Sequence, residues 1–306
     1  MIDIVADIGG TNARIGLARG GRVDPASVRR YRNADFPDFG ALIAAHVAAA
    51  GGQRVRALVV AIAGPVTGRV ARLTNLDWVL DADRLAADLG GAEVRLVNDL
   101  RALGHALPVL AEGDLAPLVA GPVRARGNGQ SLIVGIGTGF NVSLVIAPDI
   151  VAEAEYGHVG LSAAIAARLG ALGVDPAAFP TVEELFSGRG LAAFARRAAG
   201  RDFAWAEAAL SGPDGAPAPV LAAYLGLVAE LARDLVLAFM PLSGVHFAGG
   251  AMRGLVATGL GDAFAQGFAR PHPIVEGLAR VPVSIITADA AALAGCARLL
   301  RAPVAG

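Results

Sequence analysis

The sequence predicts an α/β protein of two lobes with a central cleft, in which one strand-turn-strand unit is duplicated. Apolar runs of strand length, rich in valine and isoleucine, alternate with helix-like stretches along the 306 residues, and this alternation is typical of α/β layers. The segment VADIGGTNARIGLA, from Val5, is echoed by VGIGTGFNVSLV, from Val134. A hairpin that recurs once in each half of a chain of this length indicates two lobes of related structure.

The elements are expected in alternation along the chain. Strands are expected at residues 2–6, 57–63, 94–97, 132–136, 142–146, 245–247 and 283–287. Helices are expected at residues 39–50, 82–89, 100–110, 190–199, 219–240, 254–268 and 290–300.

The charge balance excludes several classes of partner. The formal net charge of -1 and the pI near 6.5 provide no field that would attract nucleic acid or an anionic membrane, so a small-molecule partner is expected instead. Two long uncharged runs, residues 127–148 and 235–252, contain glycine and proline, which favour strands, turns and a helix end over membrane spans.

Two residue counts exclude further chemistries. The chain has no lysine, which excludes a Walker loop, a protein-kinase strand lysine and Schiff-base catalysis. The only cysteine, Cys296, can form neither an internal disulfide nor a cysteine cluster for a metal. Because the N-terminus also lacks the pattern of a signal peptide, a cytoplasmic location is expected.

The first glycine turn, DIGGTN at residues 7–12, follows the first strand. Consecutive glycines let a backbone approach phosphate oxygens and donate N–H groups to them, and the Thr11 hydroxyl and Asn12 amide add donors. Asp7 can hold a metal ion through water. The alternative interpretation is an ordinary tight hairpin turn, in which Gly-Gly and Asn are common.

Two more glycine turns follow apolar strands. Gly137-Thr138-Gly139 repeats the chemistry of the first turn in the second half of the chain. Gly249-Gly250 follows the strand at residues 245–247 and is expected to open a helix with room for a flat group. Each turn alone is weak evidence, but the three together predict a site for a phosphorylated ligand.

Asn98-Asp99 closes the strand at residues 94–97. Aspartate is favoured as a helix N-cap, so Asp99 is expected either to cap the following helix or to place a carboxylate at the strand end, where α/β clefts bind ligands. The two roles are compatible, and a carboxylate there can accept a hydroxyl proton.

Glu155, His158 and Glu183 are candidates for hydrogen bonds to the hydroxyl groups of a sugar. Taken alone, each of them is more often an ordinary surface glutamate or a hydrogen-bonded loop histidine.

Read in order, DIGGTNAR, AGPVTG with LTNLDW, VNDLRALG, GIGTGF, EYGH, ELFSGRGL and FAGG resemble the motifs of the bacterial glucokinase family over essentially the whole chain. The resemblance implies an actin-like, hexokinase-related ATPase fold, also described as a duplicated ribonuclease H-like fold. It further implies transfer of phosphate from ATP, with Mg²⁺, to the 6-hydroxyl of glucose, in a homodimer. By analogy, the small lobe comprises residues 1–108 and 289–306 and the large lobe residues 109–288.

The resemblance also assigns roles to single residues. Asp99 would be the catalytic base, and Asp7 would hold Mg²⁺ through water. The residues implied to bind the hexose are Asn75, Asn98, Asp99, Glu155, His158 and Glu183. Those implied to bind ATP are Ala6, Asp7, Ile8, Gly9, Gly10, Thr11, Asn12, Gly137, Thr138, Gly139, Gly249 and Gly250.

Three positions depart from the family pattern. Tyr156 stands where the family has glycine in EGGH, and a positive φ there would strain a tyrosine. Its ring is expected to stack on the sugar or to crowd one hydroxyl. Asn141 replaces the last glycine of GTGLG, and asparagine tolerates a left-handed backbone. Arg189 replaces the proline of SGPG, near Glu183.

Other functions remain alternatives at this point. A kinase for mannose, fructose or an amino sugar shares the same motifs, and a degenerate sugar or nucleotide sensor is the non-catalytic alternative. An actin-like activator with an iron-sulfur cluster is excluded by the single cysteine. A sugar-sensing repressor is disfavoured because the chain begins in a strand, without a helix-turn-helix.

Overall fold

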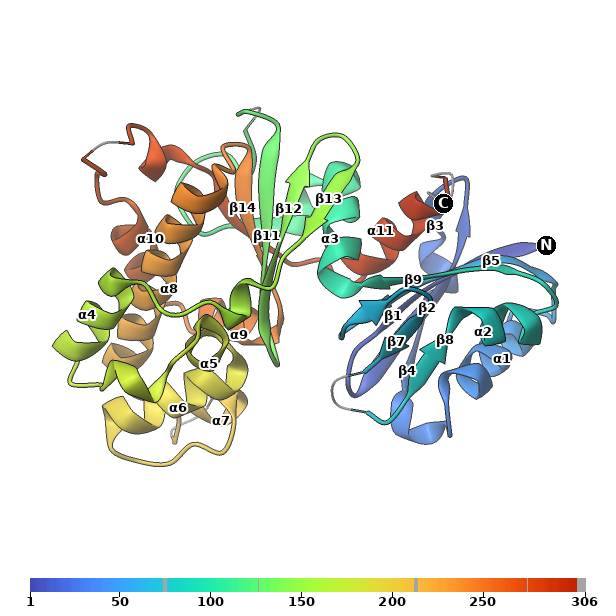
Figure 1. Ribbon diagram of the computed structural model, residues 1–306, viewed down its shortest axis with the longest axis horizontal. Helices are drawn as coiled ribbons and strands as arrows, with labels where there is room; N and C mark the ends of the chain where they lie inside the picture. The colour runs from blue at the N-terminus through green and yellow to red at the C-terminus, as the bar shows by residue number, and fades with distance from the viewer. Residues whose placement is uncertain (74–75, 126, 212–213, 274, 302–306) are drawn as a thin grey trace. The chain divides into compact units, whose positions relative to one another are not determined.

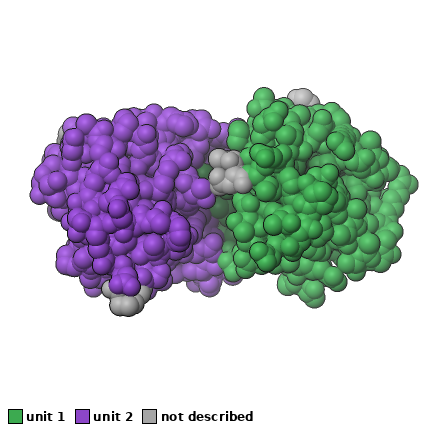
Figure 2. Space-filling model, turned by 90° about the horizontal axis from the view of Figure 1, so that it is seen from below, with its two compact units in different colours: residues 1–110, 288–306 green, residues 111–287 purple. Residues whose placement is uncertain are grey.

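A computed structural model describes residues 1–73, 76–125, 127–211, 214–273 and 275–301. By internal contacts the chain divides into unit 1, residues 1–110 with 288–306, and unit 2, residues 111–287 (Figure 2). None of the described helices is long and apolar enough to cross a membrane.

Unit 1 is built on a six-stranded sheet of order β3-β2-β1-β5-β9, with β4 paired to β2 (Figure 1). Its strands are β1 (Ile2–Ile8), β2 (Asn12–Arg19), β3 (Arg22–Val23), β4 (Arg29–Arg32), β5 (Val55–Ile62) and β9 (Glu93–Asn98). A small second sheet comprises β6 (Val66–Thr67), β7 (Val70–Arg72) and β8 (Val79–Asp81). The helices are α1 (Phe39–Ala49), α2 (Ala82–Asp88), α3 (Asp99–Ala106) and α11 (Ala291–Leu299).

The large sheet of unit 1 is buried on both faces, and the period-2 alternation of strand side chains sends successive residues to different cores. Ile4 and Ile8 of β1 belong to a core that they share with α1 and α2, whereas Val5 belongs to a second core with Leu293 and Cys296 of α11. The C-terminal helix thus completes unit 1. Cys296 is a buried core residue with a free thiol.

Unit 2 repeats this plan in a six-stranded sheet of order β10-β15-β14-β11-β12-β13 (Figure 1). Its strands are β10 (Leu115–Pro117), β11 (Gln130–Ile136), β12 (Phe140–Ile146), β13 (Ile150–Glu153), β14 (Gly244–Ala248) and β15 (Val283–Ile286). Its helices are α4 (Ala163–Ala171), α5 (Val182–Phe186), α6 (Gly188–Ala199), α7 (Ala206–Leu210), α8 (Ala218–Phe239), α9 (Gly250–Ala257) and α10 (Gly261–Phe268).

The duplication expected from the repeated hairpin is confirmed by strand pairing. In unit 1, β1 pairs antiparallel with β2 and parallel with β5, which pairs parallel with β9. In unit 2, β11 pairs antiparallel with β12 and parallel with β14, which pairs parallel with β15. The two glycine turns therefore occupy the same place in their sheets, between the antiparallel pair.

One predicted helix is wrong in extent. Residues 254–268 form two helices, α9 and α10, because Gly259 between them has a φ of 78° and interrupts the helical backbone. The short helices α4, α5 and α7 and the small sheet of unit 1 were not predicted. They carry too few periods of apolar residues to be recognised.

Candidate active site

In unit 1, the strand register brings two predicted groups to one edge of the sheet. Ile8, at the end of β1, is opposite Ile62 of β5, and Ile62 is opposite Asn98 of β9. The glycine turn after β1 and the Asn98-Asp99 pair after β9 therefore lie at the carboxyl ends of two strands that are separated only by β5. This is the edge at which parallel α/β sheets bind ligands.

The glycine turn at residues 7–12 is closed by a backbone hydrogen bond, which leaves Gly10 and Thr11 at its tip. The Gly9 N–H donates to the Asn12 carbonyl at 3.0 Å, so Gly9 does not offer its N–H to a phosphate as expected. Gly10 and Thr11 remain as the candidate donors. Ala6, Asp7 and Ile8 complete β1 before the turn.

Asn33 supports this turn from 24 residues along the chain. Its Nδ2 donates to the Gly9 carbonyl at 2.8 Å, and its backbone N–H donates to the Thr11 carbonyl at 3.0 Å. The side chain is buried. Sequence reasoning missed this role, because nothing around Asn33 indicates which turn it reaches.

Asn98, rather than Asp99, caps α3, so the expectation that Asp99 is the N-cap is wrong. The Asn98 Oδ1 accepts the backbone N–H groups of Leu100 at 3.0 Å and Arg101 at 3.4 Å. The Asp99 carboxylate accepts the same Leu100 N–H at 2.9 Å, and Asp99 is the first residue of the helix. Asparagine caps as well as aspartate does, which frees Asp99 for another role.

Burial, followed by the nearby negative charge of Asp7, raises the pKa of Asp99 to about 7. Hydrogen bonds from the start of α3 oppose this shift. Asp7 lies in an ion pair with Arg14, with Nη1 and Oδ2 3.7 Å apart. Unit 1 thus holds a carboxyl group that can exchange a proton near neutral pH beside a second carboxylate.

In unit 2, the structure brings the second and third glycine turns together. A Cβ on Gly249 would lie 2.3 Å from the Ile136 carbonyl oxygen, and Gly249 has a φ of 102°, so only glycine fits there. Gly250 begins α9, which confirms the expected helix start. The Gly137 N–H donates to the Gly139 carbonyl at 3.0 Å, which leaves Thr138 and Gly139 as candidate donors.

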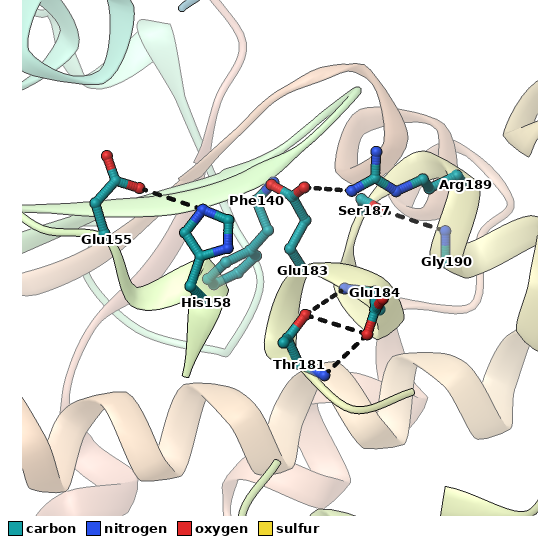
Figure 3. Close-up of polar contacts among 9 residues, drawn as sticks. All are labelled: Phe140, Glu155, His158, Thr181, Glu183, Glu184, Ser187, Arg189 and Gly190. Atoms are coloured by element: carbon teal, nitrogen blue, oxygen red, sulfur yellow. Dashed lines mark hydrogen bonds and ion pairs between the residues drawn. The ribbon is translucent and has the colours of Figure 1, made fainter. Parts of the chain in front are cut away.

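Glu183, in α5, lies beside the second turn. Its Oε2 accepts the Phe140 N–H at 3.0 Å, and its Oε1 forms an ion pair with Arg189 (Figure 3). The side chain of Glu183 is only 22% exposed, against 65% for Arg189. Arg189, which stands where the family has proline, therefore supplies a cation that holds the Glu183 carboxylate. The sequence did not predict this role.

Glu155 and His158 occupy the short turn after β13. The Oε2 of Glu155 lies 4.0 Å from the Nε2 of His158, and both side chains are about three-quarters exposed (Figure 3). Asn75, the remaining predicted hexose ligand, lies outside the described residues.

Tyr156 is not strained, and neither Tyr156 nor Asn141 has a left-handed backbone. Among the described residues other than glycine, Met240 is the one with a positive φ. The Tyr156 ring contacts Phe239 of α8 edge-on, with centroids 5.8 Å apart. It lines a pocket of about 460 Å³ in unit 2 to which Glu155, His158 and Glu183 do not contribute, and this placement argues against the expected stacking on the sugar.

The sequence is similar to those of known glucokinases over nearly its whole length. The glucokinase family profile matches residues 4–303. A glucokinase of Saccharophagus degradans is 28% identical over 316 residues, which cover 97% of each chain. A glucokinase of Chelativorans sp. is 30% identical over 323 residues, which cover 98% of this chain and 91% of the relative.

Solved structures show the same fold. A glucokinase from an Antarctic psychrotroph matches 98% of both chains with a TM-score of 0.79 and 24% identity. A glucokinase from Balamuthia mandrillaris in complex with glucose matches 98% of this chain and 93% of its own, with a TM-score of 0.72 and 19% identity. The expected actin-like ATPase fold is confirmed. Because the family profile spans nearly the whole sequence, this chain belongs to the glucokinase family.

Proposed function

We propose that the protein is a glucokinase that transfers the terminal phosphoryl group of ATP to the 6-hydroxyl of D-glucose. The observation that carries this proposal is Asp99, a carboxyl group with a pKa of about 7 at the ligand-binding edge of the sheet in unit 1. A general base works best when its pKa is close to the working pH. Membership of the glucokinase family supports glucose as the substrate and ATP as the donor.

In this proposal Asp99 accepts the proton of the 6-hydroxyl while the oxygen of that hydroxyl bonds to the phosphorus transferred from ATP. Asn98 orients the start of α3 through its cap, and its Nδ2, which donates to the Gly64 carbonyl at 3.3 Å, has a second hydrogen for a sugar hydroxyl. The family motifs support Glu155, His158 and Glu183 as further ligands of the hexose hydroxyls.

The phosphates are bound by the tips of the glycine turns. The family motifs support Gly10, Thr11, Thr138 and Gly139 in this role, because they can donate N–H or hydroxyl groups to phosphate oxygens. Gly249 and Gly250 lie near the adenosine, where the absence of side chains leaves room for a flat ring.

The oxygen ligands of unit 1 fit Mg²⁺. Asp7 offers a carboxylate, the oxygen ligand that Mg²⁺ prefers. The negative charge of Asp7 disfavours ionisation of Asp99, so a bound cation would reduce the repulsion between the two carboxylates. The described residues include no group of three or more His, Cys, Asp or Glu side chains for a metal. Asp7 would therefore hold Mg²⁺ through water, together with substrate phosphates, and the ion would neutralise charge on the transferred group.

The same proposal includes a cytoplasmic homodimer. The experiment that tests the function measures ADP release with glucose, mannose, fructose and amino sugars, with ATP and polyphosphate compared as donors. We expect glucose and ATP to give the highest kcat/KM and glucose 6-phosphate to be the product. Binding of a hexose without turnover would favour the sensor alternative, and a higher kcat/KM with another hexose would reassign the substrate.

A further inference from the structure

Asn141, the second residue of β12, makes two hydrogen bonds to the turn that carries Glu155. Its Oδ1 accepts the backbone N–H of Tyr156 at 3.0 Å, and its Nδ2 donates to the Glu155 Oε2 at 3.0 Å. Its Oδ1 also accepts the N–H of Val142 at 2.9 Å. One carboxamide thus uses its donor and its acceptor to hold two consecutive residues of the turn.

The strand register explains why a side chain is needed at this place. The β12-β13 ladder ends at the pair Ser143 and Glu153. Continued by two residues in each strand, this register would place Asn141 opposite Glu155, but β13 has already ended there. The Asn141 side chain replaces the missing backbone pairing and ties the turn to β12.

The same contacts orient Glu155. An exposed glutamate normally samples several rotamers and loses that freedom when a ligand binds. Here the Oε2 of Glu155 is the atom bonded to Asn141 and also the atom that lies 4.0 Å from His158. These contacts favour one orientation of the carboxylate before any ligand binds.

We propose that Asn141 is a positioning residue for hexose recognition, which acts by fixing the Glu155 carboxylate. This inference rests on the proposed function, because Glu155 is a hexose ligand only within that proposal. Asn141 itself does not contact the sugar. Preorganisation of this kind lowers the cost of binding without taking part in phosphoryl transfer.

The test is Asn141→Asp, which keeps the shape and the oxygen that accepts the Tyr156 N–H. The substitution replaces the Nδ2 group that donates to Glu155 by a carboxylate oxygen. The side chain at position 141 then repels the Glu155 carboxylate instead of donating a hydrogen bond to it. We expect the KM for glucose to rise by about tenfold or more, as for loss of a hydrogen bond to a charged group. The kcat and the KM for ATP should stay within about threefold of wild type, a split that a merely structural role would not produce.

A double-mutant cycle identifies the partner. In Glu155→Gln, a carboxamide faces position 141 and can donate to the carboxylate that Asn141→Asp introduces. Asn141→Asp should therefore cost much less in the Glu155→Gln background than in wild type. If the two substitutions are simply additive in the KM for glucose, Glu155 is not the group that Asn141 positions. Should Asn141→Asp fail to fold, Asn141→Ser takes its place in the cycle, because its shorter side chain withdraws the donor from Glu155 without adding charge.

Asn128→Asp is the matched control. Asn128 also lies in unit 2 and uses both ends of its side chain, donating to Gln130 Oε1 at 2.7 Å and to the Met240 carbonyl at 2.9 Å and accepting the Gln130 N–H at 3.1 Å. None of these bonds involves a proposed ligand of the sugar or of ATP. We expect its kinetic constants to match those of wild type.

The outcomes separate the inference from the function. A wild-type enzyme that phosphorylates glucose, with a variant at position 141 whose KM for glucose is unchanged, overturns the positioning role alone. A lower kcat, higher KM values for both glucose and ATP, and a lower Tm would together show that Asn141 has a structural role only. A wild-type protein that neither binds a hexose in calorimetry nor releases ADP overturns the proposed function and the inference together.

Discussion

Asp99 shows how one residue acquires its chemistry from its surroundings. Its carboxyl group is partly shielded from water and lies near the charge of Asp7, and both effects favour the protonated form. Hydrogen bonds at the start of α3 limit the shift, so the pKa settles at about 7 instead of rising further. A carboxyl group in this range can accept a proton and release it again at neutral pH.

Replacing Asp99 by Asn removes the base and keeps its shape. We expect kcat with glucose to fall by about a hundredfold or more, in line with general-base contributions of about 10² to 10⁴. Because Asn98 is the cap of α3, the helix should persist, and glucose binding measured by calorimetry should remain. If Asp99→Asn retains most of its turnover, Asp99 only bonds the Leu100 N–H and is not the base.

The raised pKa of Asp99 also predicts a pH dependence. The base must be ionised to act, so kcat/KM for glucose should be constant above about pH 8 and should fall about tenfold per pH unit well below about pH 7. The measurement is a pH profile in buffers of constant ionic strength at one fixed Mg²⁺ concentration. A cation beside Asp7 offsets its charge, but burial, the larger cause, still holds the pKa of Asp99 above that of an ordinary aspartate. A profile that is flat between about pH 5.5 and about pH 8 would contradict the assignment, because an ordinary aspartate titrates near about pH 4.

At the scale of elements, the turn between β14 and α9 depends on one glycine. Gly249 has φ 102° and ψ 155°, a region that residues with a Cβ hardly enter, and a Cβ there would meet the Ile136 carbonyl. The glycine lets the start of α9 lie against the turn after β11, where the adenosine is proposed to bind.

Gly249→Ala should therefore be costly. Holding a residue with a Cβ at these backbone angles costs about 1–3 kcal/mol of folding free energy. The steric conflict with the Ile136 carbonyl adds to this cost. We expect a lower Tm in thermal unfolding and a higher KM for ATP than for the wild type. Gly261→Ala is the matched control, because Gly261 likewise begins a helix, α10, is not a proposed ligand of ATP or of the hexose, and would carry a Cβ that meets no atom within 4 Å. Equal Tm and KM values for the two variants would show that this close approach has no consequence.

For the whole molecule, the duplicated topology gives each unit a glycine turn at the same position in its sheet, β1-β2 in unit 1 and β11-β12 in unit 2. The chain has no lysine, so neither turn is followed by the ammonium group that many phosphate-binding loops use. Backbone donors, arginine and a metal ion are left to neutralise the phosphates.

This composition predicts an absolute requirement for the metal. Removing Mg²⁺ with excess EDTA should reduce turnover to background, and adding back Mg²⁺ should restore it, because transfer of a phosphoryl group requires its charge to be neutralised. Asp7→Ala should raise the Mg²⁺ concentration needed for half-maximal rate and leave glucose binding unchanged. Full turnover in excess chelator would exclude this role of the metal.

Local sequence was sufficient to predict the alternation of strands and helices, the duplicated hairpin, the three glycine turns and the Asn98-Asp99 pair. These features are set by the period of the side chains and by the backbone preferences of Gly and Asn. Even so, the boundary between α9 and α10 was missed, since a single glycine decided it.

Which distant residues meet became evident only from the folded chain. Arg189 pairs with Glu183, Asn33 holds the Gly9 turn, Asn141 reaches Glu155, and the Tyr156 ring contacts Phe239. Each of these contacts depends on strand register or on helix packing, and neither can be predicted from the neighbouring residues in the sequence. The sequence thus named the groups that can do the chemistry, whereas the fold set their partners, because hydrogen bonds and charge effects act over a few ångströms in space and not along the chain.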